Sequence, residues 1–419
     1  MREGAATPEP PAVPSPAPRG SAMRVVLKPG RDWAVRGGHP WIFSGAIATT
    51  EGEGEPGSVV EVWSADGRQL GSGTWSPRTS IAVRMLARGA TAVDDALIRE
   101  RIASALRLRA LVRETDAWRL VNGEGDQLPG VVVDRYDTFL VCQFLTAGAD
   151  RLKPAIVAAL AALQTPRGIF ERSEGSVRTA EGLPRSVGVL AGDEPPPTVA
   201  IVESGRRYLV DIRSGQKTGF FLDQRANRDL LATIAAGRRV LNLFAYSGAF
   251  SVAALQGGAA HVVSVDSSAA AIAQAEEHGR LNGFAPDTAT FVRADVFAYL
   301  RGTAEPADLI VLDPPPFARR RADRERALAG YKEINVQALR LCAPEALLMT
   351  FSCSQHVEAG AFEDVVAQAA ADAGRDCQLL ARLGPALDHP QALPHHEGRY
   401  LKGLLLRVGG APGARGARC

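Results

Sequence analysis

The pattern of apolar and polar positions changes twice along the chain. From Arg24 to about Ala92, short apolar runs are separated by glycine-containing turns, which is typical of a small β barrel. A helical period over Asp95–Glu114 then opens a stretch of mixed strand, turn and helix signals, which predicts a small α/β unit. Further on, strands and helices alternate strictly, which predicts a doubly wound parallel sheet. The expected strands of this sheet are 240–244, 261–266, 290–293, 308–312, 346–352, 378–383 and 402–408.

These changes divide the chain into three predicted domains. We place a β domain at 23–92, a central α/β domain at 93–195 and a Rossmann-like domain at 196–410. Residues 1–22 contain six prolines and almost no large apolar side chain, so we expect a disordered tail there. Residues 411–419 are expected to form a second flexible tail.

Composition excludes several classes of protein. Nothing approaches the roughly 18 consecutive apolar residues of a membrane span, and a secretory signal layout is lacking, which favours the cytosol. The five cysteines form no CxxC pair, so neither a disulfide framework nor a zinc site is expected. The neighbours His395 and His396 also lack metal-ligand spacing, and we expect them in an exposed loop. The net charge of +2 gives no global attraction to nucleic acid.

Ligands of open α/β sheets lie beyond the carboxyl ends of the strands, so the residues that follow each strand are candidate site residues. The first strand leads into a loop of small residues that ends at Gly248, and the second ends in Asp266, which suits a ribose diol. The glycine-rich fingerprint that holds a pyrophosphate is lacking, which favours a nucleoside without phosphates, namely S-adenosylmethionine (SAM). Asp295, after the third strand, is expected near the adenine. The predicted cofactor-binding residues are Phe244, Ala245, Tyr246, Gly248, Asp266, Ser267, Asp295, Asp313, Gln224 and Arg225.

The fourth strand ends in a stiff turn that begins Asp313-Pro314-Pro315. Prolines fix the backbone and remove donors, which leaves carbonyl oxygens free to accept from the amine of a base beside a carboxylate. This turn is common to methyltransferases that act on planar nitrogen or on ring carbon. We predict Pro314, Pro315, Phe317 and Lys217 as substrate-binding residues.

Cys353 follows the fifth strand, and it decides between these two chemistries. An exocyclic amine needs no thiol, whereas carbon 5 of a pyrimidine becomes nucleophilic only after a thiolate adds to carbon 6. We therefore predict Cys353 as the nucleophile, with its pKa lowered by a cation or helix N-terminus, and Asp313 as the group that stabilises the adduct. Two alternatives stay open: amine methylation of guanine or adenine with Cys353 as a bystander, and a non-catalytic RNA-binding assembly factor.

Two further segments carry candidate residues. Asp223 is expected to cap a helix over 224–234, on which Arg225 and Arg228 lie one turn apart and are candidates for phosphate contacts. In the β domain, the favoured interpretation of Trp41 and Phe43 is barrel core.

The combined motifs resemble the PUA-domain-containing 23S rRNA cytosine-C5 methyltransferases (RlmI-type), over residues 24 to about 408. The resemblance implies a PUA domain that binds RNA, a central domain, and a class I methyltransferase domain with Cys353 as nucleophile and Asp313 beside the base. It also implies 23S rRNA as partner and a homodimer. In this chain Pro316 stands where many relatives have Lys. The matching motifs are 38–45, 119–126, 218–225, 242–248, 313–315, 352–354 and 400–404.

Overall fold

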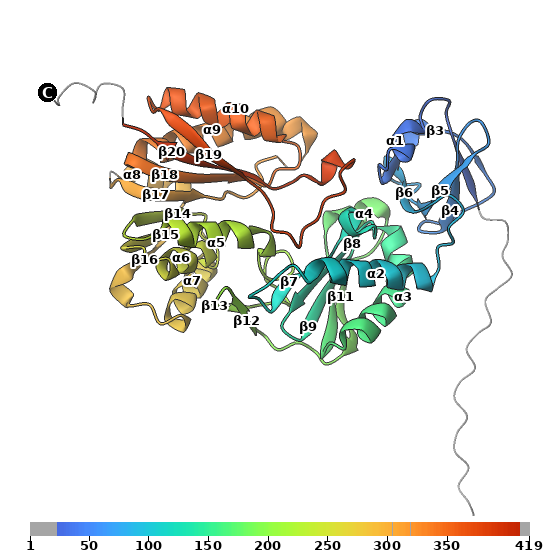
Figure 1. The fold of residues 1–419 in the computed structure, drawn as a ribbon, viewed down its shortest axis with the longest axis horizontal. Coiled ribbons are helices and arrows are strands. Elements are labelled where there is room, and N and C mark those ends of the chain that lie inside the picture. The colour runs from blue at the N-terminus through green and yellow to red at the C-terminus, as the bar shows by residue number, and fades with distance from the viewer. Residues whose placement is uncertain (1–22, 304, 319, 411–419) are drawn as a thin grey trace, which may run out of the picture.

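The computed structural model describes residues 23–410 except 304 and 319, and it has three parts, each built on its own sheet (Figure 1). The two expected tails, 1–22 and 411–419, lie outside the described residues. No described helix is long and apolar enough to cross a membrane.

The described N-terminal part consists of strands and two short helical turns, α1 (Trp33–Arg36) and the 3-10 turn η1 (Ser44–Ala46). Its six strands pair in the order β2-β6-β5-β4-β1-β3, and fully buried valines of β1 and β4 form its core. Trp41 and Phe43 do not belong to that core, so this prediction was wrong: Trp41 is partly buried and Phe43 is 42% exposed. The strands are β1 (Arg24–Leu27), β2 (Trp41–Phe43), β3 (Ile47–Glu51), β4 (Val59–Trp63), β5 (Gln69–Trp75) and β6 (Ile81–Arg88).

The central part is a five-stranded sheet in the order β11-β10-β9-β8-β7, packed against α2 (Asp95–Arg109) and α3 (Ala147–Gln164). Helix α3 begins at Ala147, where the side chain of Thr146 caps it by accepting from the backbone N–H of Ala149. A short helix α4 (Ser176–Glu181) follows β10. The strands are β7 (Ala117–Asn122), β8 (Val131–Tyr136), β9 (Phe139–Phe144), β10 (Gly168–Ser173) and β11 (Ser186–Gly192).

The hairpin β12 (Val199–Glu203) and β13 (Arg206–Val210) connects the central part to the C-terminal part. Its apolar face joins a cluster that includes Tyr136 of the central sheet and Val252 of the C-terminal part. The proposed domain boundary near 195 therefore falls just before a hairpin whose core is shared by both parts.

The C-terminal part confirms the doubly wound sheet. Its seven strands lie in the order β16-β15-β14-β17-β18-β20-β19, and all pair in parallel except β20, which is antiparallel to both neighbours. Both faces are buried, so β17 reads as a continuous apolar run: Leu309 and Val311 face one helical layer, Ile310 and Leu312 the other. The strands are β14 (Arg239–Leu243), β15 (His261–Asp266), β16 (Ala289–Arg293), β17 (Ala307–Leu312), β18 (Cys342–Ser352), β19 (Cys377–Leu383) and β20 (Lys402–Val408).

Helices cover both faces of this sheet. Residues of α5 and α6 pack on one face, where α7 contacts α6 and β15, while α8, α9 and α10 cover the other. These helices are α5 (Arg225–Ile234), α6 (Ala249–Gln256), α7 (Ala269–Leu281), α8 (Val296–Gly302), α9 (Arg324–Leu341) and α10 (Ala359–Asp372).

Between β19 and β20 the chain leaves the sheet and returns. We call residues 384–401 the crossing segment; it runs to the central and N-terminal parts before it re-enters the sheet at β20 (Figure 1). The Asp388 carboxylate accepts from the backbone N–H of Arg119 on β7 at 3.0 Å, and Glu397 lies 3.2 Å from the ring of His39. The crossing segment thus contacts all three parts.

Candidate active site

The loop after β14 has a backbone shape that few residues tolerate. Phe244, Tyr246 and Gly248 all have positive φ values, of 58°, 45° and 71°. A Cβ atom on Gly248 would lie 2.7 Å from the Cβ of Ala275 on α7, so only glycine fits there. The backbone N–H of Tyr246 donates to the Asp266 carboxylate at 2.9 Å, which fixes the loop against the end of β15.

The acidic residues expected to bind the cofactor accept hydrogen bonds from backbone N–H groups of the protein and still have free acceptor positions. Asp266 accepts from the N–H groups of Tyr246 and Ser268, and a carboxylate offers about four lone-pair sites. Asp295 is exposed and caps α8 through the N–H of Ala298 at 2.9 Å. Ser267 lies exposed beside Asp266.

These residues fit a nucleoside sulfonium such as SAM. The loop lets a ligand approach the backbone, and the Asp266 carboxylate has acceptor capacity for ribose hydroxyls. The buried hydroxyl oxygen of Ser247, in the same loop, lacks a hydrogen-bond partner among the described residues. A buried polar atom of this kind is normally satisfied, which is consistent with a ligand at this loop.

Asp313 begins the turn after β17, and its carboxylate accepts from the Gln224 side chain at 2.9 Å. Gln224 is oriented in turn by Asn227, which donates to its amide oxygen at 2.6 Å. Burial raises the pKa of Asp313 to about 7, and the charge of Asp223 adds to this rise, while Lys217 opposes it. The group can therefore carry or release a proton near neutral pH.

Cys353 follows β18, the neighbour of β17, and its Sγ lies 3.7 Å from the carbonyl oxygen of Pro314. The strand order thus brings the Cys353 loop and the Asp313 turn together. Burial raises the pKa of the Cys353 thiol to about 12; the charge of Asp313 raises it further, while Lys217 and Lys402 lower it. This raised pKa is contrary to the lowered pKa expected from the sequence.

Buried polar contacts hold the Cys353 loop in place. The hydroxyl of Ser354 bonds with Tyr331 at 2.8 Å and accepts from the N–H of Ala318 at 3.2 Å. The amino group of Lys402 donates to the carbonyl oxygens of Ser354 at 2.5 Å and Tyr400 at 2.9 Å. Burial lowers the pKa of Lys402 to about 8. Lys402 faces Ser352 across the β18–β20 pair, which explains how a residue late in the chain reaches this loop.

Asp223 belongs to the site in a way that the sequence did not reveal. It lies in the 3-10 turn η3 (Leu222–Gln224) and does not cap α5, so the predicted cap was wrong. Its carboxylate accepts from Lys217 at 2.6 Å and from the hydroxyl of Tyr400 at 2.7 Å. Burial alone would raise the pKa of Asp223, but the charge of Lys217 and these hydrogen bonds hold it well below its usual range.

Several predicted residues lie elsewhere. Arg225 is buried and donates to Asp388 and to the carbonyl of Ala117, and buried Arg228 forms a bidentate pair with Glu203. The structure thus brings neither to the cofactor loop nor to solvent, and the predicted phosphate contacts were wrong. The ring of Phe317 packs on Tyr331 with centroids 4.7 Å apart, against the α9 core, whereas Pro315 is exposed.

The comparisons with known proteins agree with this geometry. Residues 158–393 match the family model of S-adenosylmethionine-dependent methyltransferases, and residues 25–88 match that of PUA-like domains. A solved structure of a proposed SAM-dependent methyltransferase from Streptococcus mutans has the same fold, with a TM-score of 0.79 and 24% identity over 92% of this chain and all of that one. The fold and the loop after β14 therefore define a class I SAM-dependent methyltransferase.

Two relatives narrow the assignment. The protein named ribosomal RNA large subunit methyltransferase I from Erwinia tasmaniensis is 42% identical over 393 residues, which cover 92% of this chain and 99% of the relative. That of Aeromonas salmonicida is 43% identical over 391 residues, with the same coverage. The chain belongs to the family of ribosomal RNA large subunit methyltransferase I.

Proposed function

We propose that this enzyme methylates carbon 5 of a cytosine in 23S rRNA through a covalent adduct with Cys353. The relatives' name supports ribosomal RNA of the large subunit as substrate. The observation that carries the cytosine chemistry is the position of the Cys353 thiol, 3.7 Å from the carbonyl oxygen of Pro314 in the Asp313 turn. A base held by that turn lies within reach of a nucleophile.

The reaction requires a bond from sulfur to carbon 6 of the base. The Cys353 thiolate adds there, and the electrons of the carbon 5–carbon 6 double bond move towards carbon 5, which becomes nucleophilic. When bound, SAM would supply the methyl group to carbon 5 and leave as S-adenosylhomocysteine. A base then removes the hydrogen on carbon 5 as a proton; the electrons of that bond restore the double bond while the bond between carbon 6 and sulfur breaks, so the Cys353 thiolate is regenerated.

Asp313 links the adduct to proton transfer. With a pKa of about 7, its carboxyl group can donate a hydrogen bond to ring nitrogen 3, which stabilises the negative charge that develops on the ring. Protonation of Asp313 also removes a charge that raises the pKa of Cys353. The neutral carboxyl group therefore favours both the thiolate and the adduct.

Cofactor binding is assigned to the loop after β14 and to Asp266, with Asp295 beside the adenine. Gln224 holds Asp313 in orientation. The target cytosine must be unpaired or flipped out of its stack, at a cost of a few kcal/mol. The PUA-like part supplies contacts to the RNA backbone.

Trapping with 5-fluorocytosine RNA tests the adduct, because fluorine on carbon 5 blocks the final elimination. A 23S rRNA transcript made in vitro with 5-fluorocytosine in place of cytosine, incubated with the enzyme and SAM, should give a protein–RNA complex that survives denaturation. Cys353→Ala should bind SAM and form no complex. Cys377→Ala is the matched control, since Cys377 is a partly buried cysteine on β19. Normal turnover by Cys353→Ala, or a methylated purine in the product, would instead favour amine methylation.

We also propose that the enzyme acts in the cytosol, as the sequence favours, and as a homodimer, as the resemblance implies. Light scattering at two protein concentrations measures the mass in solution. A mass of one chain, about 44 kDa, at both concentrations would exclude the homodimer.

A further inference from the structure

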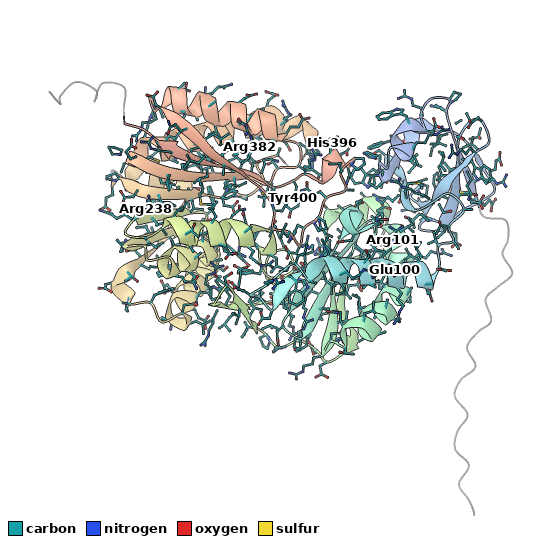
Figure 2. The ribbon with its side chains drawn as sticks, viewed as in Figure 1. Glu100, Arg101, Arg238, Arg382, His396 and Tyr400 are labelled. Carbon is teal, nitrogen blue, oxygen red and sulfur yellow. The ribbon has the colours of Figure 1, made fainter. Side chains whose placement is uncertain are left out.

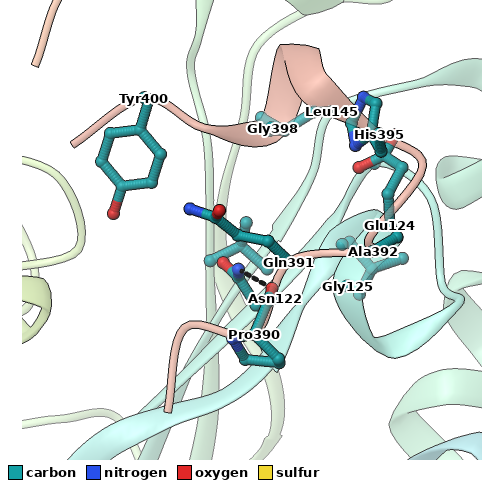
Figure 3. Close-up of a pocket in the computed structure, with 14 residues that line it drawn as sticks. Asn122, Glu124, Gly125, Leu145, Pro390, Gln391, Ala392, His395, Gly398 and Tyr400 are labelled. Atoms are coloured by element: carbon teal, nitrogen blue, oxygen red, sulfur yellow. Dashed lines mark hydrogen bonds between the residues drawn. The ribbon is translucent and has the colours of Figure 1, made fainter. Parts of the chain in front are cut away.

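The three parts of the molecule meet at two adjoining cavities beside the crossing segment. The smaller cavity, of about 150 Å³, lies between the loop after β7 and residues 390–400 (Figure 3). The larger cavity, of about 480 Å³, lies between the N-terminal sheet, α2 and residues 392–394. Glu124, Gly125 and Ala392 line both cavities, so the two are contiguous.

The smaller cavity contains one buried polar atom without a hydrogen-bond partner among the described residues, Nε2 of His395, which lies 4.0 Å from the Glu397 carboxylate. His395 was expected in an exposed loop, but it is 4% exposed, and its ring packs against Trp41 with centroids 4.3 Å apart. Its Nε2 atom is buried and has no hydrogen-bond partner among the described residues. Buried ring nitrogens are normally paired, so this cavity is suited to a ligand that supplies a partner. Gln391 presents its amide between Asn122 and Tyr400 (Figure 3).

The smaller cavity also borders the active site. Tyr400 lines it, and the Tyr400 hydroxyl donates to Asp223 at 2.7 Å. Asp223 precedes Gln224, whose amide holds Asp313. The cavity therefore borders, through Tyr400 and Asp223, the residues that hold Asp313.

The larger cavity contains two guanidinium groups that lack a carboxylate partner in the described part of the chain. Arg101, on α2, donates to the carbonyl of Leu86 at 2.9 Å, and Arg88, at the end of β6, lines the same cavity (Figure 2 labels Arg101). Glu100 pairs instead with Arg107 at 2.7 Å. Burial and the charge of Arg88 lower the pKa of Arg101, while the charge of Glu100 opposes this, so the two cations are held close together.

We propose that this junction binds the nucleotide next to the target cytosine, with its phosphate on Arg88 and Arg101 and its base in the smaller cavity against His395 and Gln391. The inference rests on the proposed function, because it takes RNA as the substrate. Arginine forks match phosphate geometry. A cavity of about 150 Å³ admits a ring the size of benzene, so a single-ring base fits.

The test compares variants of the full-length enzyme on two readouts: KM for ribosomal RNA, and the salt dependence of binding to a fluorescent single-stranded oligoribonucleotide. For Arg88→Gln with Arg101→Gln, we expect KM to rise about tenfold, as for the loss of one charge-assisted contact. The slope of log affinity against log salt should fall by about 0.7, the value for one phosphate of a single strand. Arg99→Gln neutralises an exposed arginine on the same helix and should change neither KM nor the salt slope.

The base site is tested with His395→Phe, which keeps the aromatic packing and removes the ring nitrogens, and with Gln391→Ala. Each should raise KM with the salt slope and SAM affinity unchanged. A methylating wild-type enzyme whose KM and salt slope are unaffected by all these changes would overturn the inference and leave the proposed function intact. A wild-type enzyme that does not methylate ribosomal RNA would instead contradict the proposed function. SAM affinity also reports correct folding, and if His395→Phe fails to bind SAM, Gln391→Ala and the arginine pair decide the outcome.

Discussion

The carboxyl group of Asp313 lies where its charge is unfavourable, so removing the charge should stabilise the fold while it impairs the chemistry. The pKa is about 7 in the folded protein against an ordinary value of 3.8, a difference of about 3. Between these pH values the folded state binds more protons than the unfolded state, so stability falls as pH rises from about 4 to 7. At 1.36 kcal/mol for each pH unit the upper limit is about 4 kcal/mol, and solvent screening reduces it to about 2 kcal/mol.

Asp313→Asn keeps an oxygen for the Gln224 amide and has no charge to titrate. Its melting temperature should match that of the wild type near pH 4 and exceed it by about 4–8 °C at pH 8, since 1 kcal/mol corresponds to about 2–4 °C in a domain of this size. Thermal unfolding followed by circular dichroism between pH 4 and pH 8 measures this difference in melting temperature. Methyl transfer should fall by about a hundredfold or more.

Asp287→Asn, which neutralises an exposed carboxylate, is the control and should show no such gap. The reasoning about Asp313 would be refuted if its variant differed from the wild type by the same amount at every pH. It would also be refuted if the wild type were the more stable protein at pH 8.

Three further substitutions test other parts of the site. Gly248→Ala should lower SAM affinity about tenfold by calorimetry, because its Cβ would lie 2.7 Å from that of Ala275 at a φ of 71°. Glu203→Gln should lower the free energy of unfolding, measured in urea, by about 3–5 kcal/mol, because it leaves buried arginines without their carboxylate. Lys402→Met removes a charge that lowers the pKa of Cys353, so alkylation of this thiol by iodoacetamide should slow roughly three- to tenfold at pH 7.5.

Each of these changes has a matched control. Gly258→Ala also has a positive φ, of 80°, with no atom closer than 3.8 Å, and should leave SAM affinity unchanged. Glu305→Gln breaks an exposed ion pair with Arg239 and should lower the free energy of unfolding by less than about 1 kcal/mol. Lys332→Met removes a surface ammonium and should not slow alkylation. Equal effects in a variant and its control would contradict the corresponding argument.

The residues that the sequence revealed are those that follow strands of the parallel sheet. Asp266, Asp313 and Cys353 were found because strand positions can be recognised from apolar runs, and parallel strands bring their carboxyl ends to one edge. The roles assigned to them stay predictions until the variants are measured.

The residues that the sequence missed depend on contacts between distant segments. Tyr400 bonds to Asp223 across 177 positions, and no local pattern predicts such a pair. Arg228 was misjudged because a polar position on a helix looks the same whether it faces water or a buried carboxylate such as Glu203. The same holds for His395, which is buried by Trp41 of another part of the molecule.

The crossing segment has a consequence for how the protein is made. Asn122 donates to the carbonyl of Pro390 across 268 positions, and the N–H of Arg119 reaches Asp388 across 269. The last strand of the central part ends at Gly192, and at about 5–20 residues per second the chain from there to Asp388 takes roughly 10–40 seconds to synthesise. During that interval its loop after β7 lacks its final covering, so a nascent chain stalled before residue 384 should expose this loop to proteolysis. When the last strands leave the ribosome, the crossing segment covers this loop and the active site is completed at the same stage.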